Sequence, residues 1–242
     1  MDNTIEMRHE SISRWSIICA VIINAAIVVM EIIATIMTSE THGIGMFKYY
    51  TIESNIFAGI SSAIFVVVAI LHLTKGHSIP KWVKGLRYMA TCCLTVTIAV
   101  VLFAAMPMEP RENAFEIWMT YREAIFQHLI CPIVSFISFV FFEKEPKMRR
   151  KFILVGFSPT VAYGVGVVGL TLNQDIEALY TFAAVSTQPV MVSIFWGVAI
   201  MGAALLICYI TWKINSMKFP GDVDPQEFAE LEETAELNDS TN

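Results

Sequence analysis

The stretch Tyr49–Leu71, YYTIESNIFAGISSAIFVVVAIL, decides the fold of this chain. From Ile56 onward it is apolar apart from two serines, whereas its polar residues fall together between Thr51 and Asn55. A run of about 20 apolar residues forms a helix long enough to cross the ~30 Å hydrocarbon core of a bilayer. The stretch therefore predicts a transmembrane helix whose polar beginning is either an ordinary helix start or a site.

Five further blocks of the same kind flank this stretch. The 242-residue chain is 55% hydrophobic, with a mean hydropathy of +0.59, and its apolar residues are concentrated in these blocks. The six predicted spans are Trp15–Met37, Tyr49–Leu71, Tyr88–Met106, Ile125–Phe142, Phe152–Leu170 and Val190–Trp212. We therefore predict an all-α polytopic membrane protein with six transmembrane helices in one domain, residues 1–218.

The charged residues predict the topology. Thirteen of the sixteen Lys and Arg residues fall in the amino-terminal segment, the loops after the second and fourth helices, and the region after the sixth. Lys84 and Arg87 are counted among these loop residues. Because basic loops stay inside, both termini are predicted to be cytoplasmic. Residues 219–242 contain eight acidic and no basic side chains, which is typical of a disordered tail. The expected location is a membrane, namely the plasma membrane if the source is prokaryotic.

Polar residues of three predicted helices fall at one depth under this topology. Just beneath the outer surface, the sequence places Glu31, Thr51, Glu53, Asn55, Gln127 and His128. The inner halves of the same helices are predicted to be nearly free of ionisable residues. Polar groups are costly in a bilayer, so they face the bundle interior and often mark function. This layer is therefore the candidate site.

Thr51 and His128 are the candidate catalytic pair within the layer. A nucleophilic hydroxyl needs a base to take its proton, and an imidazole at the same depth can do this. Pro132 cannot donate a backbone hydrogen bond to the carbonyl of His128, so the helix is expected to kink or loosen there. The alternatives stay open, because a membrane threonine usually bonds a carbonyl of its own helix, and a histidine can simply link two helices.

The other polar residues are candidates for supporting roles. Glu31, Glu53 or Glu123 is expected to orient the histidine, in the role of the third member of a triad, or to pair with a cation at the interface. Asn55 or Gln127 is a candidate for stabilising an oxyanion.

The segment Pro107–Glu123 is too polar to span a membrane and carries Phe115, Trp118 and Tyr121. It is predicted to form an interfacial loop or short helix, acting either as a lid over the outer layer or as an aromatic anchor.

No motif in the sequence points to a metal or cofactor. The five cysteines lie in predicted helices without metal-ligand spacing, and they are interpreted as packing residues. No phosphate-binding loop or nucleic-acid-binding surface is present in the sequence pattern. The expected partner is a lipid from the bilayer.

The motifs FKYYTIESN (47–55) and FQHLICP (126–132), on the second and fourth of six helices, resemble the androgen-induced-gene family of intramembrane threonine hydrolases. Members of that family cleave fatty acid esters of hydroxy fatty acids. The resemblance implies that Thr51 is the nucleophile and His128 the essential histidine. We therefore expect a lipid-ester hydrolase. A lipid acyltransferase, and a small transporter or sensor using Glu31, Glu53 and His128 as a proton relay, are the alternatives.

Overall fold

The computed structural model describes residues 2–144, 148–172, 180 and 188–217, so the acidic tail lies outside the described residues. Six helices in this part of the chain are long and apolar enough to cross a membrane, and no strand occurs in it. The prediction of an all-α protein with six candidate membrane spans is confirmed.

Six α-helices are labelled in the described part of the chain. They are α1 (Asp2–His42), α2 (Tyr50–Lys75), α3 (Lys81–Val100), α4 (Cys131–Ile137), α5 (Phe152–Leu172) and α6 (Val190–Asn215). A 3-10 helix, Gly43–Lys48, precedes α2, and a π-helical turn, Val101–Ala105, extends α3. The fourth span, Ile125–Phe142, consists of α4 between two π-helical segments, Ile125–Ile130 and Ser138–Phe142.

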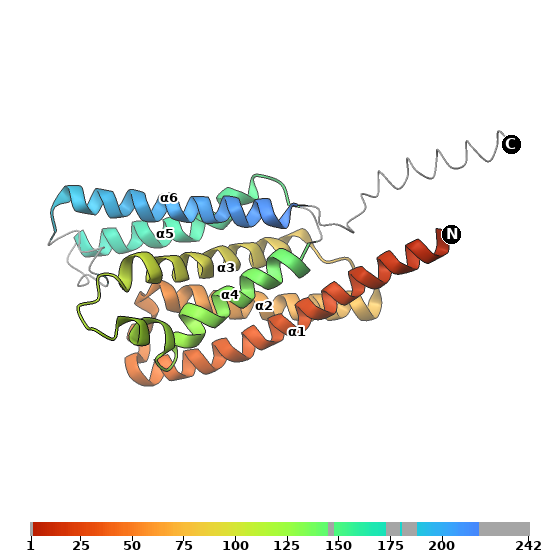
Figure 1. The fold of residues 1–242 in the computed structure, drawn as a ribbon, viewed down its shortest axis with the longest axis horizontal. Coiled ribbons are helices and arrows are strands. Elements are labelled where there is room, and N and C mark those ends of the chain that lie inside the picture. Colours follow the sequence, from red (N-terminus) through yellow and green to blue (C-terminus); the bar gives the residue numbers. More distant parts are fainter. Residues whose placement is uncertain (1, 145–147, 173–179, 181–187, 218–242) are drawn as a thin grey trace.

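The helices run along the long axis of the molecule, with α3 in the centre (Figure 1). α3 contacts α2, α4, α5 and α6, and it is the most buried of the six spans. α1 packs against α2 and the fourth span, whereas α5 and α6 pack against α3 and each other. The start of α1 and the end of α6 lie at the same end of the bundle (Figure 1).

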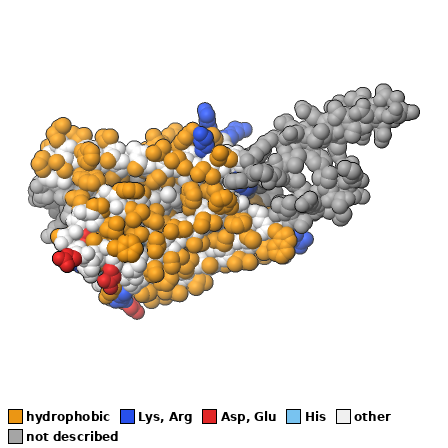
Figure 2. All heavy atoms as spheres, viewed as in Figure 1, with side chains coloured by type: hydrophobic (Ala, Val, Ile, Leu, Met, Phe, Trp, Pro, Cys, Tyr) orange, Lys and Arg blue, Asp and Glu red, His pale blue; other side chains and the backbone are white. Residues whose placement is uncertain are grey.

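The surface of the bundle matches a membrane environment. Figure 2 shows apolar side chains over the middle of the molecule, with charged side chains gathered toward its ends. Many large apolar residues point outward; Ile22, Phe103 and Val198 are 64%, 78% and 69% exposed. A soluble protein rarely exposes so much contiguous apolar surface. Together with the six apolar helices, this surface indicates an integral membrane protein.

The beginning of α3 corrects the sequence prediction. The helix begins at Lys81 rather than Tyr88, so Lys84 and Arg87 lie inside it and both are buried. Arg87 forms an ion pair with the buried Glu143, with Nη2 3.1 Å from Oε1. The prediction that placed Lys84 and Arg87 in a loop is therefore wrong. The prediction that the inner halves of the first, second and fourth helices are nearly free of ionisable residues did not consider this pair, because Arg87 lies on α3 and Glu143 directly follows the fourth span.

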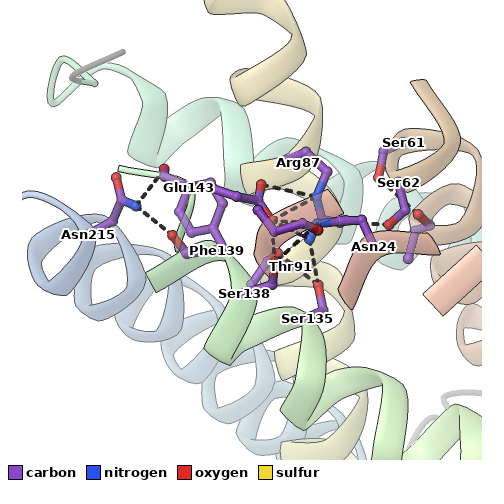
Figure 3. Close-up of polar contacts among 12 residues, drawn as sticks. Asn24, Ser61, Ser62, Arg87, Thr91, Ser135, Ser138, Phe139, Glu143 and Asn215 are labelled. Carbon is purple, nitrogen blue, oxygen red and sulfur yellow. Dashed lines mark hydrogen bonds and ion pairs between the residues drawn. The ribbon is translucent and has the colours of Figure 1, made fainter. Parts of the chain in front are cut away.

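A network of hydrogen bonds surrounds this ion pair (Figure 3). Arg87 also donates to Ser62 of α2 and Ser135 of α4, at 3.1 and 3.3 Å. Glu143 also accepts hydrogen bonds from Asn24 of α1 (2.9 Å) and Ser138 (2.7 Å). Buried charges are tolerated when they are paired and hydrogen-bonded. Because Asn24 lies on α1, Ser62 on α2, Arg87 on α3 and the two serines 135 and 138 on the fourth span, the network ties these four parts of the bundle together.

Candidate functional site

A cavity of about 540 Å³ lies at the end of the bundle where α2 begins. This volume falls within the ~300–1,000 Å³ that is usual for small-molecule sites. Its walls come from the first turn of α2, the second half of α3, α5, α6 and the side chains of Trp118 and Tyr180. Most of the lining is Val, Gly, Ile and Met. The hydroxyl groups that border it belong to Tyr50, Thr51, Thr97, Thr160, Tyr163, Tyr180 and Ser193.

Local backbone structure explains why α2 begins at this cavity. The 3-10 helix Gly43–Lys48 starts at a left-handed glycine, Gly43 with φ +55°, and ends at the extended residue Tyr49. The Tyr50 amide, which has no partner within the helix, donates to the hydroxyl of Tyr180 at 3.2 Å. Thr51 follows in the first helical turn and borders the cavity. The polar beginning of α2 is thus a helix start and part of a cavity wall.

The fold brings Asn55 and Gln127 into contact, which is consistent with the common depth predicted for them. The Asn55 side-chain amide donates to the carbonyl oxygens of Thr51 (2.7 Å) and Gln127 (3.3 Å). The Gln127 amide donates in turn to the Thr38 hydroxyl of α1 at 3.1 Å. Neither Asn55 nor Gln127 borders the cavity. The hydrogen bonds of these two side chains link α1, α2 and the fourth span. Asn55 also bonds the backbone carbonyl of Thr51.

His128 lies in the π-helical segment Ile125–Ile130, and this segment directly precedes α4, which has Pro132 in its first turn. The predicted loosening of the helix near Pro132 takes this form. The ring is buried, and its Nδ1 lies 2.6 Å from the carbonyl oxygen of Trp118. A carbonyl can only accept a hydrogen bond, so Nδ1 carries the hydrogen and Nε2 is the basic nitrogen of the neutral ring.

Trp118 connects His128 to the cavity. His128 itself does not border the cavity, whereas Trp118 does. The two rings are packed with centroids 6.0 Å apart and an interplanar angle of 31°. Thr51 thus borders the cavity itself, whereas His128 contacts Trp118, which borders the cavity.

The segment Pro107–Glu123 holds Trp118 in place. It contains the short π-helix Glu116–Thr120, which confirms that this segment includes a short helix. The Trp118 indole donates to Glu109 Oε2 at 3.1 Å, and Glu109 pairs with Arg111 at 2.6 Å. The hydrogen bond from Arg111, aided by that from Trp118, lowers the pKa of Glu109 to about 2. At neutral pH the carboxylate is ionised and fixes the indole.

The candidate carboxylates occupy three different environments. Glu53 is exposed. Glu31 is buried on α1 beside Cys131 and Gly59, and no ion pair with a described cation forms there. Glu123 pairs with Arg122, with Oε2 3.4 Å from Nε, and lies close enough to the His128 imidazole to act on it electrostatically. Of the three, Glu123 is thus the carboxylate best placed to influence His128.

Sequence reasoning did not identify the hydroxyls of α5 and the following connection. Tyr50 and Thr160 hydroxyls are 2.7 Å apart, and the Tyr163 hydroxyl donates to the Lys48 carbonyl at 2.8 Å. Thr160 and Tyr163 are three residues apart and therefore share a face of α5. In the sequence, the signal for these cavity hydroxyls is the three-residue spacing of Thr160 and Tyr163, just before a glycine-rich run that begins at Gly164.

No group of three or more His, Cys, Asp or Glu side chains able to hold a metal ion occurs in the described part of the chain. Comparison with protein-family models, curated proteins and solved structures gives no match. The class is defined by the fold and the site: a six-helix integral membrane protein with an apolar cavity bordered by hydroxyl groups. The resemblance to the androgen-induced-gene family stays a prediction.

Proposed function

We propose that this protein is an intramembrane hydrolase that cleaves a lipid ester, with Thr51 as nucleophile and His128 as base. The observation that carries the proposal is the position of Trp118, which borders the same cavity as Thr51 and accepts the Nδ1 hydrogen of His128. A backbone carbonyl thereby fixes the tautomer that a general base needs, as a carboxylate does in a Ser-His-Asp triad.

The reaction would proceed in two steps. Nε2 of His128 takes the proton of the Thr51 hydroxyl as Oγ1 bonds the ester carbonyl carbon. The bond to the alcohol oxygen then breaks, and the departing alcohol receives the proton from His128. Water attacks the acyl-threonine by the same route, which releases the fatty acid and restores both residues. Transfer to a second alcohol instead of water would make the protein an acyltransferase.

Proton transfer requires Nε2 to approach the Thr51 hydroxyl to about 3 Å. We assign to Trp118 the role of a gate between them, because its indole contacts both the cavity and the imidazole. Displacement of the indole by a bound ester would open the imidazole to the cavity. The donors for the oxyanion would be the cavity hydroxyls, since the Asn55 and Gln127 amides are engaged elsewhere.

The distribution of basic residues supports an orientation with both termini in the cytoplasm. The cavity lies at the end of the bundle opposite the start of α1 and the end of α6 (Figure 1). The ester would then enter from the outer leaflet, and the protein would reside in the plasma membrane of a prokaryotic cell.

The test is hydrolysis of a panel of long-chain esters by the purified full-length protein. Thr51→Ala should abolish turnover, and His128→Ala should lower it by about 10²–10⁴-fold, the usual contribution of a general base. Thr74→Ala and His77→Ala are matched controls at the other end of α2, where both residues are exposed, and they should retain full activity. Unchanged hydrolysis in folded Thr51→Ala would exclude this threonine as nucleophile.

A second candidate, a proton-coupled transporter or sensor, is favoured by one observation. The Glu31 carboxyl is buried without an ion pair among the described residues, and intramembrane acids of this kind often carry protons. This reading predicts pH-dependent flux or signalling that is lost in Glu31→Gln, without any covalent adduct at Thr51.

A further inference from the structure

The described lining of the cavity carries hydroxyl groups but no charged side chain. None of the described residues that line it is Asp, Glu, Lys, Arg or His, whereas hydroxyl groups border it from α2, α3, α5, α6 and Tyr180. We propose that the cavity binds the polar end of an uncharged amphiphile, a long-chain ester or alcohol, and rejects lipids with an ionised headgroup. This inference rests on the proposed function, and it adds to that function the class of substrate that the site accepts.

The hydroxyl groups suit a neutral ligand because each of them is both a donor and an acceptor. Tyr50 and Thr160 form a pair 2.7 Å apart, and Tyr180 accepts from the Tyr50 amide at 3.2 Å. Burial raises the pKa of Tyr180, so this hydroxyl is uncharged at neutral pH. Such groups can bond an ester carbonyl or an alcohol without needing a countercharge.

An ionised headgroup would find no opposite charge among the described residues that line the cavity. A charge moved from water into an apolar site is strongly unfavourable unless it is paired. The exposed carboxylate of Glu53 lies close enough to Tyr163 to act on it electrostatically, and this charge would repel a fatty acid carboxylate. The free carboxylate that the family resemblance implies for the substrate would therefore have to remain outside the cavity.

The hydrocarbon part of the ligand has a route into the bilayer. Val165 and Val168 of α5 border the cavity and are 68% and 40% exposed. We expect the hydrocarbon chain to enter past these exposed apolar residues. A ligand can place its polar end among the hydroxyls and leave the rest of its chain among the lipids.

Two glycines offer a way to fill the cavity without disturbing the bundle. Gly169 of α5 and Gly197 of α6 border it, and a Cβ atom added at either would meet no atom within 4 Å. Gly166 and Gly202, on the same two helices, are equally unobstructed but do not border the cavity. Gly197→Leu and Gly202→Leu therefore form a matched pair, one occluding the cavity and one serving as control.

The experiment measures binding of brominated lipids to the full-length protein in nanodiscs, by quenching of tryptophan fluorescence. Trp118 and Trp196 border the cavity and report on its occupant. The probes have equal chain length: a brominated alkyl glycerol ether, a brominated fatty acid at pH 8, and a brominated alkyl trimethylammonium. The ether contains no ester bond, so binding is read without turnover.

We expect the neutral ether to bind at least about tenfold more tightly than either charged probe. Gly197→Leu should remove the saturable quenching, and Gly202→Leu should retain it. Equal or tighter binding of the fatty acid would overturn the inference, as would tight binding of the ammonium probe by the cavity aromatics. Saturable ether binding that survives Gly197→Leu would overturn it as well. Selective ether binding with no hydrolysis of any ester would instead contradict the proposed function and leave the binding site standing.

Discussion

Removal of the Arg87–Glu143 ion pair tests how the bundle is held together. Both side chains are essentially inaccessible, with 0% and 1% exposed. Arg87→Met removes the cation and leaves the buried charge of Glu143 with hydrogen bonds from Asn24 and Ser138. Breaking a buried pair from one side typically costs about 3–5 kcal/mol. For a chain of this size, that corresponds to a fall in Tm of roughly 6–20 °C.

The double variant separates pairing from packing. Glu143→Gln keeps an oxygen that can accept from Asn24 and Ser138 but removes the anion. Arg87→Met combined with Glu143→Gln leaves neither charge unpaired, so it should be less destabilised than either single variant, because replacing both ions is often close to neutral. Arg149→Met, at an exposed position, is the control.

The assay is thermal unfolding of the purified protein in detergent, followed by intrinsic tryptophan fluorescence, with the four proteins of the cycle compared in one buffer. Two results would refute the reasoning. One is a loss of less than about 1 kcal/mol in each single variant, well below the expected cost of an unpaired buried charge. The other is a double variant destabilised by the sum of the two singles.

Three further predictions follow from single positions. Stability contributed by ionised Glu109 should be complete above its ordinary pKa of 4.5 and be lost as the pH falls toward 2, so a shift in Trp118 emission over that window should disappear in Glu109→Gln. Glu31→Gln removes a buried carboxylate that has no ion pair among the described residues, so its Tm should rise at pH 8, and a lower Tm would contradict this. Gly156→Ala places a Cβ 2.5 Å from the Tyr88 ring and should destabilise the protein by about 1–3 kcal/mol, whereas Gly166→Ala, which meets nothing, should be neutral or stabilising in the same unfolding assay.

The helices were predictable because hydrophobic runs report directly on membrane-spanning length. All six spans appear, and the ranges at 125–142 and the starts at Phe152 and Val190 agree with the structure. The start of α3 was not predictable from hydropathy, because Lys84 and Arg87 resemble loop residues until their partners are known. Only the fold brings Glu143 to Arg87, since the two are 56 residues apart in the chain.

The candidate site was predictable in depth but not in detail. Helix direction alone placed Asn55 and Gln127 at one level, and the hydrogen bond between them agrees with that. Which side chains face the cavity depends on helix rotation, which a polar residue at a helix start does not reveal. Thr51 faces the cavity and Glu53 is exposed, although they are only two residues apart. Tyr180 was not identified because its role depends on a contact with α2 made by a connecting segment.

The most direct test of the proposed function is a search for a covalent adduct on Thr51. The full-length protein is treated with a lipid-like fluorophosphonate, digested, and mapped by mass spectrometry. The account predicts an adduct on the Thr51 peptide, absent in Thr51→Ala, strongly reduced in His128→Ala and unchanged in Thr74→Ala. Labelling that persists in Thr51→Ala, or a folded wild-type protein that hydrolyses esters without any adduct at Thr51, would contradict it.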